Sequence, residues 1–142
     1  MRGTIPWLIG LIAALMLVGY VSHTPVRHLI QITPCLLSVF LLWRGYRWAP
    51  ISALPLFALW FVLMSLIWAF LLGIAKVLSG HFTPTEIALT IVIAVCCLGG
   101  FSTALREYKS RSIFTPLLVF VLFLALQAGA LWFSMHSQYS RM

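Results

Sequence analysis

Acidic residues are nearly absent from this 142-residue chain, which has no aspartate and only two glutamates, Glu86 and Glu107. Charged residues of both signs make up only 8% of the sequence, although nine lysines and arginines give a net charge of +7. Coupled transporters commonly need an ionisable group within the membrane, and catalytic magnesium is commonly held by carboxylates. The shortage of carboxylates therefore argues against both classes of protein.

Motifs of the common enzyme classes are missing as well. The sequence contains no GxSxG, no HExxH and no P-loop, three patterns that position a nucleophile, a zinc ion or a phosphate. We therefore expect a protein that is not an enzyme. Its basic residues stand singly or in small groups beside apolar segments, which favours lipid headgroups as their counter-charge and argues against a nucleic-acid partner.

Cysteine is scarce and does not form a recognisable framework. Cys35, Cys96 and Cys97 all lie within apolar segments, their number is odd, and no CxxC occurs. Two successive helical residues point about 100° apart, so Cys96 and Cys97 are poorly placed to bind one metal together. We interpret all three as packing residues.

Hydrophobic residues, by contrast, make up 63% of the chain, and its mean hydropathy is +1.08. A soluble domain of this size cannot have such a composition, so lipid must surround the chain and its backbone must be satisfied within helices. The sequence predicts a single integral-membrane domain over 1–142, an all-α bundle of about five transmembrane helices. The expected spans are 5–22, 26–43, 51–75, 85–105 and 113–135.

The distribution of basic residues predicts the orientation of these spans. With five crossings, the N-terminus and the connectors at 44–50 and 106–112 share one side. That side carries Arg2, Arg44, Arg47, Arg106, Lys109 and Arg111. The opposite side carries Arg27, Lys76 and Arg141. The positive-inside rule places the N-terminus in the cytoplasm and the C-terminus outside, in a bacterial-type inner membrane, with the connector bases and Trp48 at the lipid headgroups.

Threonine–proline pairs mark local breaks in the apolar segments. The sequence TPTE at 83–86 is typical of a capping box, with Thr83 as the N-cap and Glu86 reaching back to it. Pro34 follows Thr33 within the second span and is expected to kink it. Because Arg27, His28 and Gln31 also lie in its first turns, its apolar core is only about fifteen residues long, and the sequence leaves open whether it crosses completely.

Small residues recur four apart in three of the spans, a spacing that lets helices approach closely in lipid. The candidate packing residues are Gly10, Ala14, Cys96, Gly99, Gly100, Ala104, Ala125 and Gly129. Four of them lie in the segment 85–105, which we therefore expect at the centre of the bundle.

A few polar or aromatic side chains are expected inside the membrane. Gln31 and Gln127 each need a partner there, either a neighbouring helix, a buried water, or a ligand such as a quinone. Trp60 and Trp68 are eight residues apart on one face of their span. Ordinary helix packing explains this face, although a lipid or a pigment would also fit it.

Four histidines form the remaining candidate site. His23, His28, His81 and His136 all fall on the expected outer side, where neutral imidazoles could bind copper, zinc or a haem iron. They also fit a role as interfacial polar residues without a ligand, so no cofactor is predicted as the main interpretation.

These observations favour a non-catalytic accessory, assembly or stabilising subunit that contacts membrane lipids and other membrane-protein subunits. Two rival hypotheses remain open: a small transporter or lipid-translocating protein that uses Gln31 and Gln127, and a metal- or haem-binding component that uses the histidines. A membrane-immunity protein is also compatible, since it needs only helix contacts.

Overall fold

The computed structural model describes residues 2–76, 80–109 and 112–136, and these residues form helices and their connections without strands. The helices are α1 (Thr4–Val21), α2 (Pro25–Gln31), α3 (Thr33–Arg44), α4 (Ala49–Leu71), α5 (Pro84–Glu107) and α6 (Phe114–Ser134). Four of them, α1, α4, α5 and α6, are long and apolar enough to cross a membrane, and α2 with α3 forms a fifth, bent candidate. The predicted class, an all-α transmembrane bundle, is confirmed.

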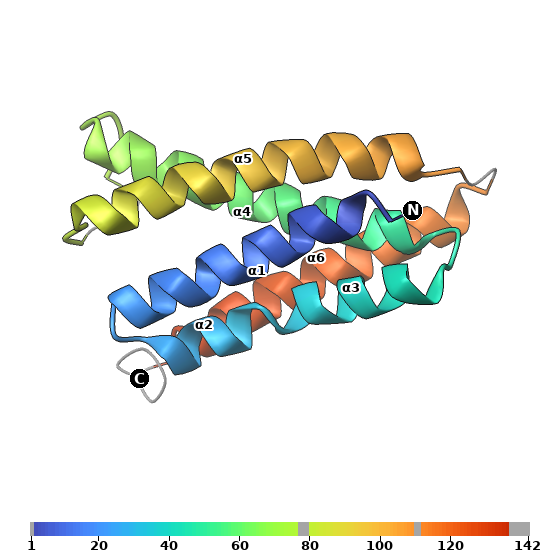
Figure 1. Cartoon of the computed structure of the whole chain (residues 1–142), viewed down its shortest axis with the longest axis horizontal. Coiled ribbons are helices and arrows are strands. Elements are labelled where there is room, and N and C mark those ends of the chain that lie inside the picture. The colour runs from blue at the N-terminus through green and yellow to red at the C-terminus, as the bar shows by residue number, and fades with distance from the viewer. Residues whose placement is uncertain (1, 77–79, 110–111, 137–142) are drawn as a thin grey trace.

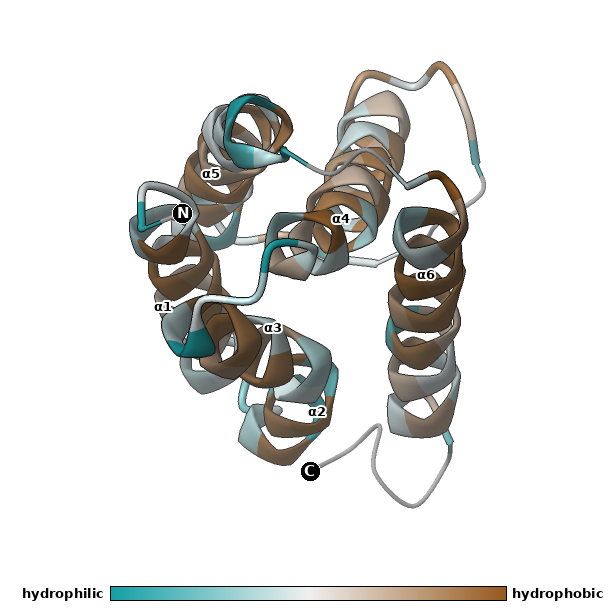
Figure 2. Ribbon diagram, turned by 90° about the vertical axis from the view of Figure 1, so that its right-hand side faces the viewer, coloured by the Kyte–Doolittle hydropathy of each residue, from teal (hydrophilic) through white to brown (hydrophobic). Residues whose placement is uncertain are grey.

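The helices run along one common axis, and the candidate spans alternate in direction when α2 and α3 are taken as one span (Figure 1). The start of α1 and the end of α6 therefore lie at opposite ends of the bundle, as an odd number of crossings requires. We call the end that holds the α1–α2 and α4–α5 connections the α1–α2 end. Seen along the axis, the five spans surround a shared interior (Figure 2), which is filled by buried side chains such as Leu11, Leu56 and Phe57.

The second span is broken, as the Thr33–Pro34 pair predicts. Helices α2 and α3 meet at an angle of 42° around Ile32. Proline has no N–H to donate to the preceding turn, and its ring crowds the carbonyl group of that turn. A helix that contains a proline therefore bends just before it. Ile32 still donates to the His28 carbonyl at 3.0 Å, so the chain bends without losing its helical path.

Both acidic side chains cap helices. At the start of α5, Glu86 N–H donates to Thr83 Oγ1 at 3.3 Å and Thr83 N–H donates to Glu86 Oε2 at 3.0 Å, so the predicted capping box is confirmed. Glu107, the last residue of α5, accepts from the N–H groups of Gly3 at 2.7 Å and Thr4 at 3.2 Å. The positive end of the α1 dipole favours this carboxylate, which ties α5 to α1.

Helix α4 ends at Leu71, before the expected span boundary at about 75. Gly73 adopts a left-handed conformation with φ +74°. Its N–H donates to the Phe70 carbonyl at 3.0 Å, and Ile74 N–H donates to the Ala69 carbonyl at 2.9 Å. This pair of bonds is a Schellman motif, and it stops the helix although the sequence remains apolar.

The expected central position of the segment 85–105 is wrong. Among the described residues, α5 packs only against α1 and α4, whereas α4 packs against α1, α3, α5 and α6. The opposite face of α5 is branched, apolar and exposed, with Ile91, Val95 and Leu98 about half accessible. Small residues on one face let α5 approach two neighbours closely, but this does not place it at the centre.

On the face of α5 that contacts α1 and α4, the glycines pack against aromatic rings. A Cβ at Gly99 would lie 2.6 Å from the Trp7 ring, and one at Gly100 would overlap the Phe57 ring on α4. The small residues of α1 and α5 therefore serve packing within this chain. Those of α6 do not, because a Cβ at Gly129 would meet nothing within 4 Å.

Replacing Gly100 with alanine should consequently destabilise the bundle by about 1–3 kcal/mol, since the Phe57 ring must move to make room. Gly129→Ala is the matched control, and it should leave stability unchanged or raise it by up to ~1 kcal/mol, because alanine favours the helix and space is available. Thermal unfolding in detergent, followed by tryptophan fluorescence, measures both. Equal stability of the two variants would contradict this packing.

Candidate functional site

A cavity of about 340 Å³ lies at the α1–α2 end of the bundle, between α1, α2, α4, α5 and α6. It lies beside the bend in the second span. Helix α3 packs against α4, but among the described residues α2 contacts only α1, α3 and α6. The bend therefore separates α2 from α4 and α5, and the cavity occupies the space between them.

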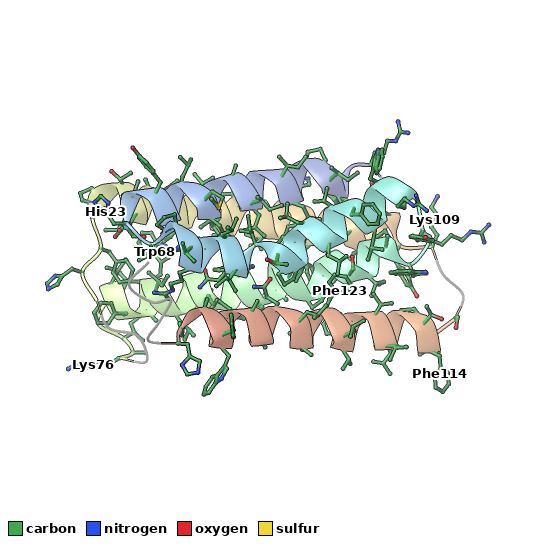
Figure 3. All side chains as sticks on the ribbon, turned by 90° about the horizontal axis from the view of Figure 1, so that it is seen from below. His23, Trp68, Lys76, Lys109, Phe114 and Phe123 are labelled. Carbon is green, nitrogen blue, oxygen red and sulfur yellow. The ribbon has the colours of Figure 1, made fainter. Side chains whose placement is uncertain are left out.

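The lining of the cavity is mostly polar at the rim and mostly apolar further in. The polar lining residues near helix ends and connections are Ser22, Thr24, Arg27, His28, His81 and Glu86, and Gln31 and Thr90 lie further in. The apolar ones include Leu15, Leu63, Met64 and Ile93 further along the helices, and Val18, Phe82, Leu131 and Met135 near the rim. Figure 3 shows this end of the molecule at His23, Trp68 and Lys76, opposite Lys109 and Phe114.

Two N–H donors of the cavity lining are buried without an acceptor among the described residues. They are the Trp60 indole N–H and the Arg27 Nε–H. Trp60 is only 4% exposed, and an unpaired buried donor costs about 1–3 kcal/mol. Trp68 on the same helix shows the usual solution, because its indole donates to Thr90 Oγ1 at 3.0 Å. Both residues line the cavity, so two unpaired donors lie close to the space that a ligand would occupy.

The first turn of α2 is held against the end of α1, and this positions Arg27. The His28 side chain packs against Gly19. A Cβ added at Gly19 would lie only 2.9 Å from the Cβ of His28. His28 Nδ1 lies 3.0 Å from the Thr24 carbonyl oxygen. The Thr24 hydroxyl in turn bonds to the Ser22 hydroxyl at 2.7 Å. The rim therefore has a fixed geometry on the α2 side.

The two intramembrane glutamines meet beside the cavity. Gln127 on α6 is fully buried, and its side-chain amide donates to the main-chain carbonyl of Gln31 at 3.1 Å. The Gln31 amide donates to Ser134 Oγ at 2.9 Å, and the Cys35 thiol lies 3.9 Å from Gln127 Oε1. These bonds fix α6 to the break between α2 and α3, so they support one wall of the cavity.

The structure separates the four candidate histidines. His28 and His81 line the cavity, whereas His23 lies in the α1–α2 connection with φ +57° and His136 follows α6. Among the described residues, no three His, Cys, Asp or Glu side chains are placed to hold a metal ion together. The binding of haem, copper or zinc stays a prediction from the sequence.

The candidate headgroup residues lie at the end opposite the cavity. The Arg44 guanidinium lies 5.9 Å from the centre of the Phe40 ring, and the Trp48 ring stacks on Tyr46 at 5.2 Å. Arg47, Arg106 and Lys109 are exposed there, and Arg111 lies outside the described residues. The packing candidates Ala14 and Ala104 are buried, whereas Ala125 is exposed on α6.

Sequence reasoning did not identify Arg27 and Trp60 as one site. Each carried a signal, since Arg27 is a charge in the first turn of an apolar span and Trp60 is a tryptophan far from either end of its span. Comparison with protein-family models, with curated proteins and with solved structures finds no match. Function is therefore inferred from the cavity and from the exposed helix faces.

Replacing Gln127 with leucine should lower the free energy of unfolding by about 0.5–2 kcal/mol, because the Gln31 carbonyl loses its donor inside the membrane. Leu122→Met, an exposed position on the same helix, is the control and should have little effect. Thermal unfolding of both variants in the same detergent makes the comparison. A Gln127→Leu variant as stable as the wild type would show that this bond does not hold α6 in place.

Proposed function

We propose that this protein is a non-enzymatic lipid-handling component that binds an amphipathic molecule in the cavity at its α1–α2 end. This corresponds to a small transporter or lipid-translocating protein. The observation that carries the proposal is the pair of buried, unpartnered donors of Arg27 and Trp60 in a cavity with a polar rim and apolar walls.

Size and position support this proposal. Small-molecule pockets usually measure roughly 300–1,000 Å³ and are mostly apolar with a few placed polar groups; this cavity, at about 340 Å³, has both properties. Its rim is built from the ends of membrane-crossing helices, which lie at the depth of lipid headgroups. Its walls, such as Leu63 and Ile93, suit hydrocarbon. An amphipathic molecule matches the two halves of the cavity, whereas a fully polar one does not.

Filling the cavity tests the proposal. Ile67→Trp places a large ring in the cavity, whereas Val62→Trp places the same ring on an exposed face of the same helix. We expect native mass spectrometry of the wild type, purified in a mild non-ionic detergent, to show one bound amphiphile per chain. Val62→Trp should keep that amphiphile, and Ile67→Trp should lose it. Absence of any bound amphiphile from the wild type, or equal binding by the two variants, would refute the proposal.

A second candidate function is that of an accessory or stabilising subunit, and one feature of α6 favours it. Ala125 and Gly129 are spaced four apart on its exposed face, beside the exposed Leu118, Leu122 and Phe133. Such a pair lets another transmembrane helix approach closely. Because the corresponding glycines of α1 and α5 already pack within the chain, α6 is the face we propose for a partner subunit.

Affinity purification in a gentle detergent tests this second function. We expect a membrane protein to co-elute at a fixed ratio with the wild type and to be lost from Gly129→Leu, because the leucine side chain keeps the two backbones apart. Val95→Leu, on the exposed face of α5, is the control that should retain it. Elution of this chain alone would count against an accessory role. The inner-membrane location and the cytoplasmic N-terminus remain part of the proposal.

A further inference from the structure

We infer that the ligand of the cavity is a single-chain amphiphile with an oxyanion head, a carboxylate or a phosphate, that Arg27 binds at the rim. This inference rests on the proposed function and names the chemical class of the ligand. It follows from the charge at the rim, from the kind of polar group that the cavity offers, and from its volume.

Arg27 is the charged group of the rim that lacks a partner among the described residues. Its Nε–H is buried, and no carboxylate there pairs with it. Glu86 also lines the cavity, but its carboxylate accepts the Thr83 N–H and lies at the positive end of the α5 dipole, which offsets its repulsion of an anion. A guanidinium has a planar fork of donors that matches a carboxylate or a phosphate. The rim is therefore suited to an oxyanion.

The volume and the walls indicate one hydrocarbon chain. At about 340 Å³ the cavity is at the small end of ligand pockets, and its inner walls carry aliphatic side chains such as Leu63, Ile67 and Ile93. Trp60 lies three turns before α4 ends at Leu71, about 16 Å along the axis. A head at Arg27 and a single chain that extends towards Trp60 would occupy the cavity.

Two sources of this ligand share the oxyanion head and the single chain. One is a free fatty acid, whose head is a carboxylate. The other is a lysophospholipid, whose phosphate is joined to its chain through a glycerol ester. The relative affinity of the wild type for one probe of each kind distinguishes the two sources.

Native mass spectrometry in a non-ionic detergent can measure binding to the full chain with two matched pairs of probes. Palmitate is compared with hexadecanol, and palmitoyl lysophosphatidate with monopalmitoylglycerol, so each pair differs in the charge of its head. In each pair that binds, we expect the oxyanion to have an affinity about tenfold or more higher than its uncharged analogue, as a charge-assisted hydrogen bond predicts. Arg27→Met should abolish the preference, and Arg47→Met, an exposed arginine at the opposite end, should retain it.

The two oxyanions then identify the source. Binding of lysophosphatidate to the wild type that is about threefold or more tighter than binding of palmitate assigns the ester-containing ligand, and the reverse order assigns the fatty acid. Arg27→Gln is a second neutral variant should methionine impair folding. The inference is overturned if the uncharged probes bind as tightly as the oxyanions, or if the neutral Arg27 variants keep the preference. Binding of none of the four probes would instead overturn the proposed function itself.

Discussion

A polar group inside a bilayer has no water to bond with, and this constraint decides how the bundle is held together. The described helices satisfy it by pairing side chains across neighbouring helices, such as Ser38 with Ser52 at 2.7 Å and Trp68 with Thr90 at 3.0 Å. Against this background, the unpaired donors of Arg27 and Trp60 are exceptional, and both line the same cavity. The need to pair buried polar groups, which explains how the helices are held together, thus also indicates where a ligand would supply missing hydrogen-bond acceptors.

One bend connects the fold to the candidate site. The break between α2 and α3 exposes Gln31 to Gln127 on α6, and the resulting hydrogen bonds fix the outer wall. The same break directs α3 towards α4 while it keeps α2 away from α4 and α5. The cavity lies on the side where α2 has no contact with α4, whereas α3, beyond the break, packs against α4. Proline at position 34 therefore contributes both to the packing and to the space that a ligand would use.

Local features of the fold could be predicted from the sequence, and relative features could not. The apolar segments, the capping box at Thr83 and the kink near Pro34 depend on residues close together in the chain, and all three are confirmed. The early end of α4 was missed because Gly73 stops the helix within a sequence that stays apolar. For the site, Gln31, Gln127 and His28 were recognised as candidates, but the pairing of Arg27 with Trp60 depends on how α2 and α4 are rotated and separated.

The sequence by itself determined the surrounding medium, the number of candidate spans and most of the helix ends, because hydropathy and capping are properties of short segments. The tertiary structure decided which polar groups meet. Glu107 reaches Gly3 across 104 residues of sequence, and the cavity brings together side chains from Leu15 to Met135. Such contacts depend on the rotation, bend and spacing of whole helices, and these follow from side-chain packing in three dimensions.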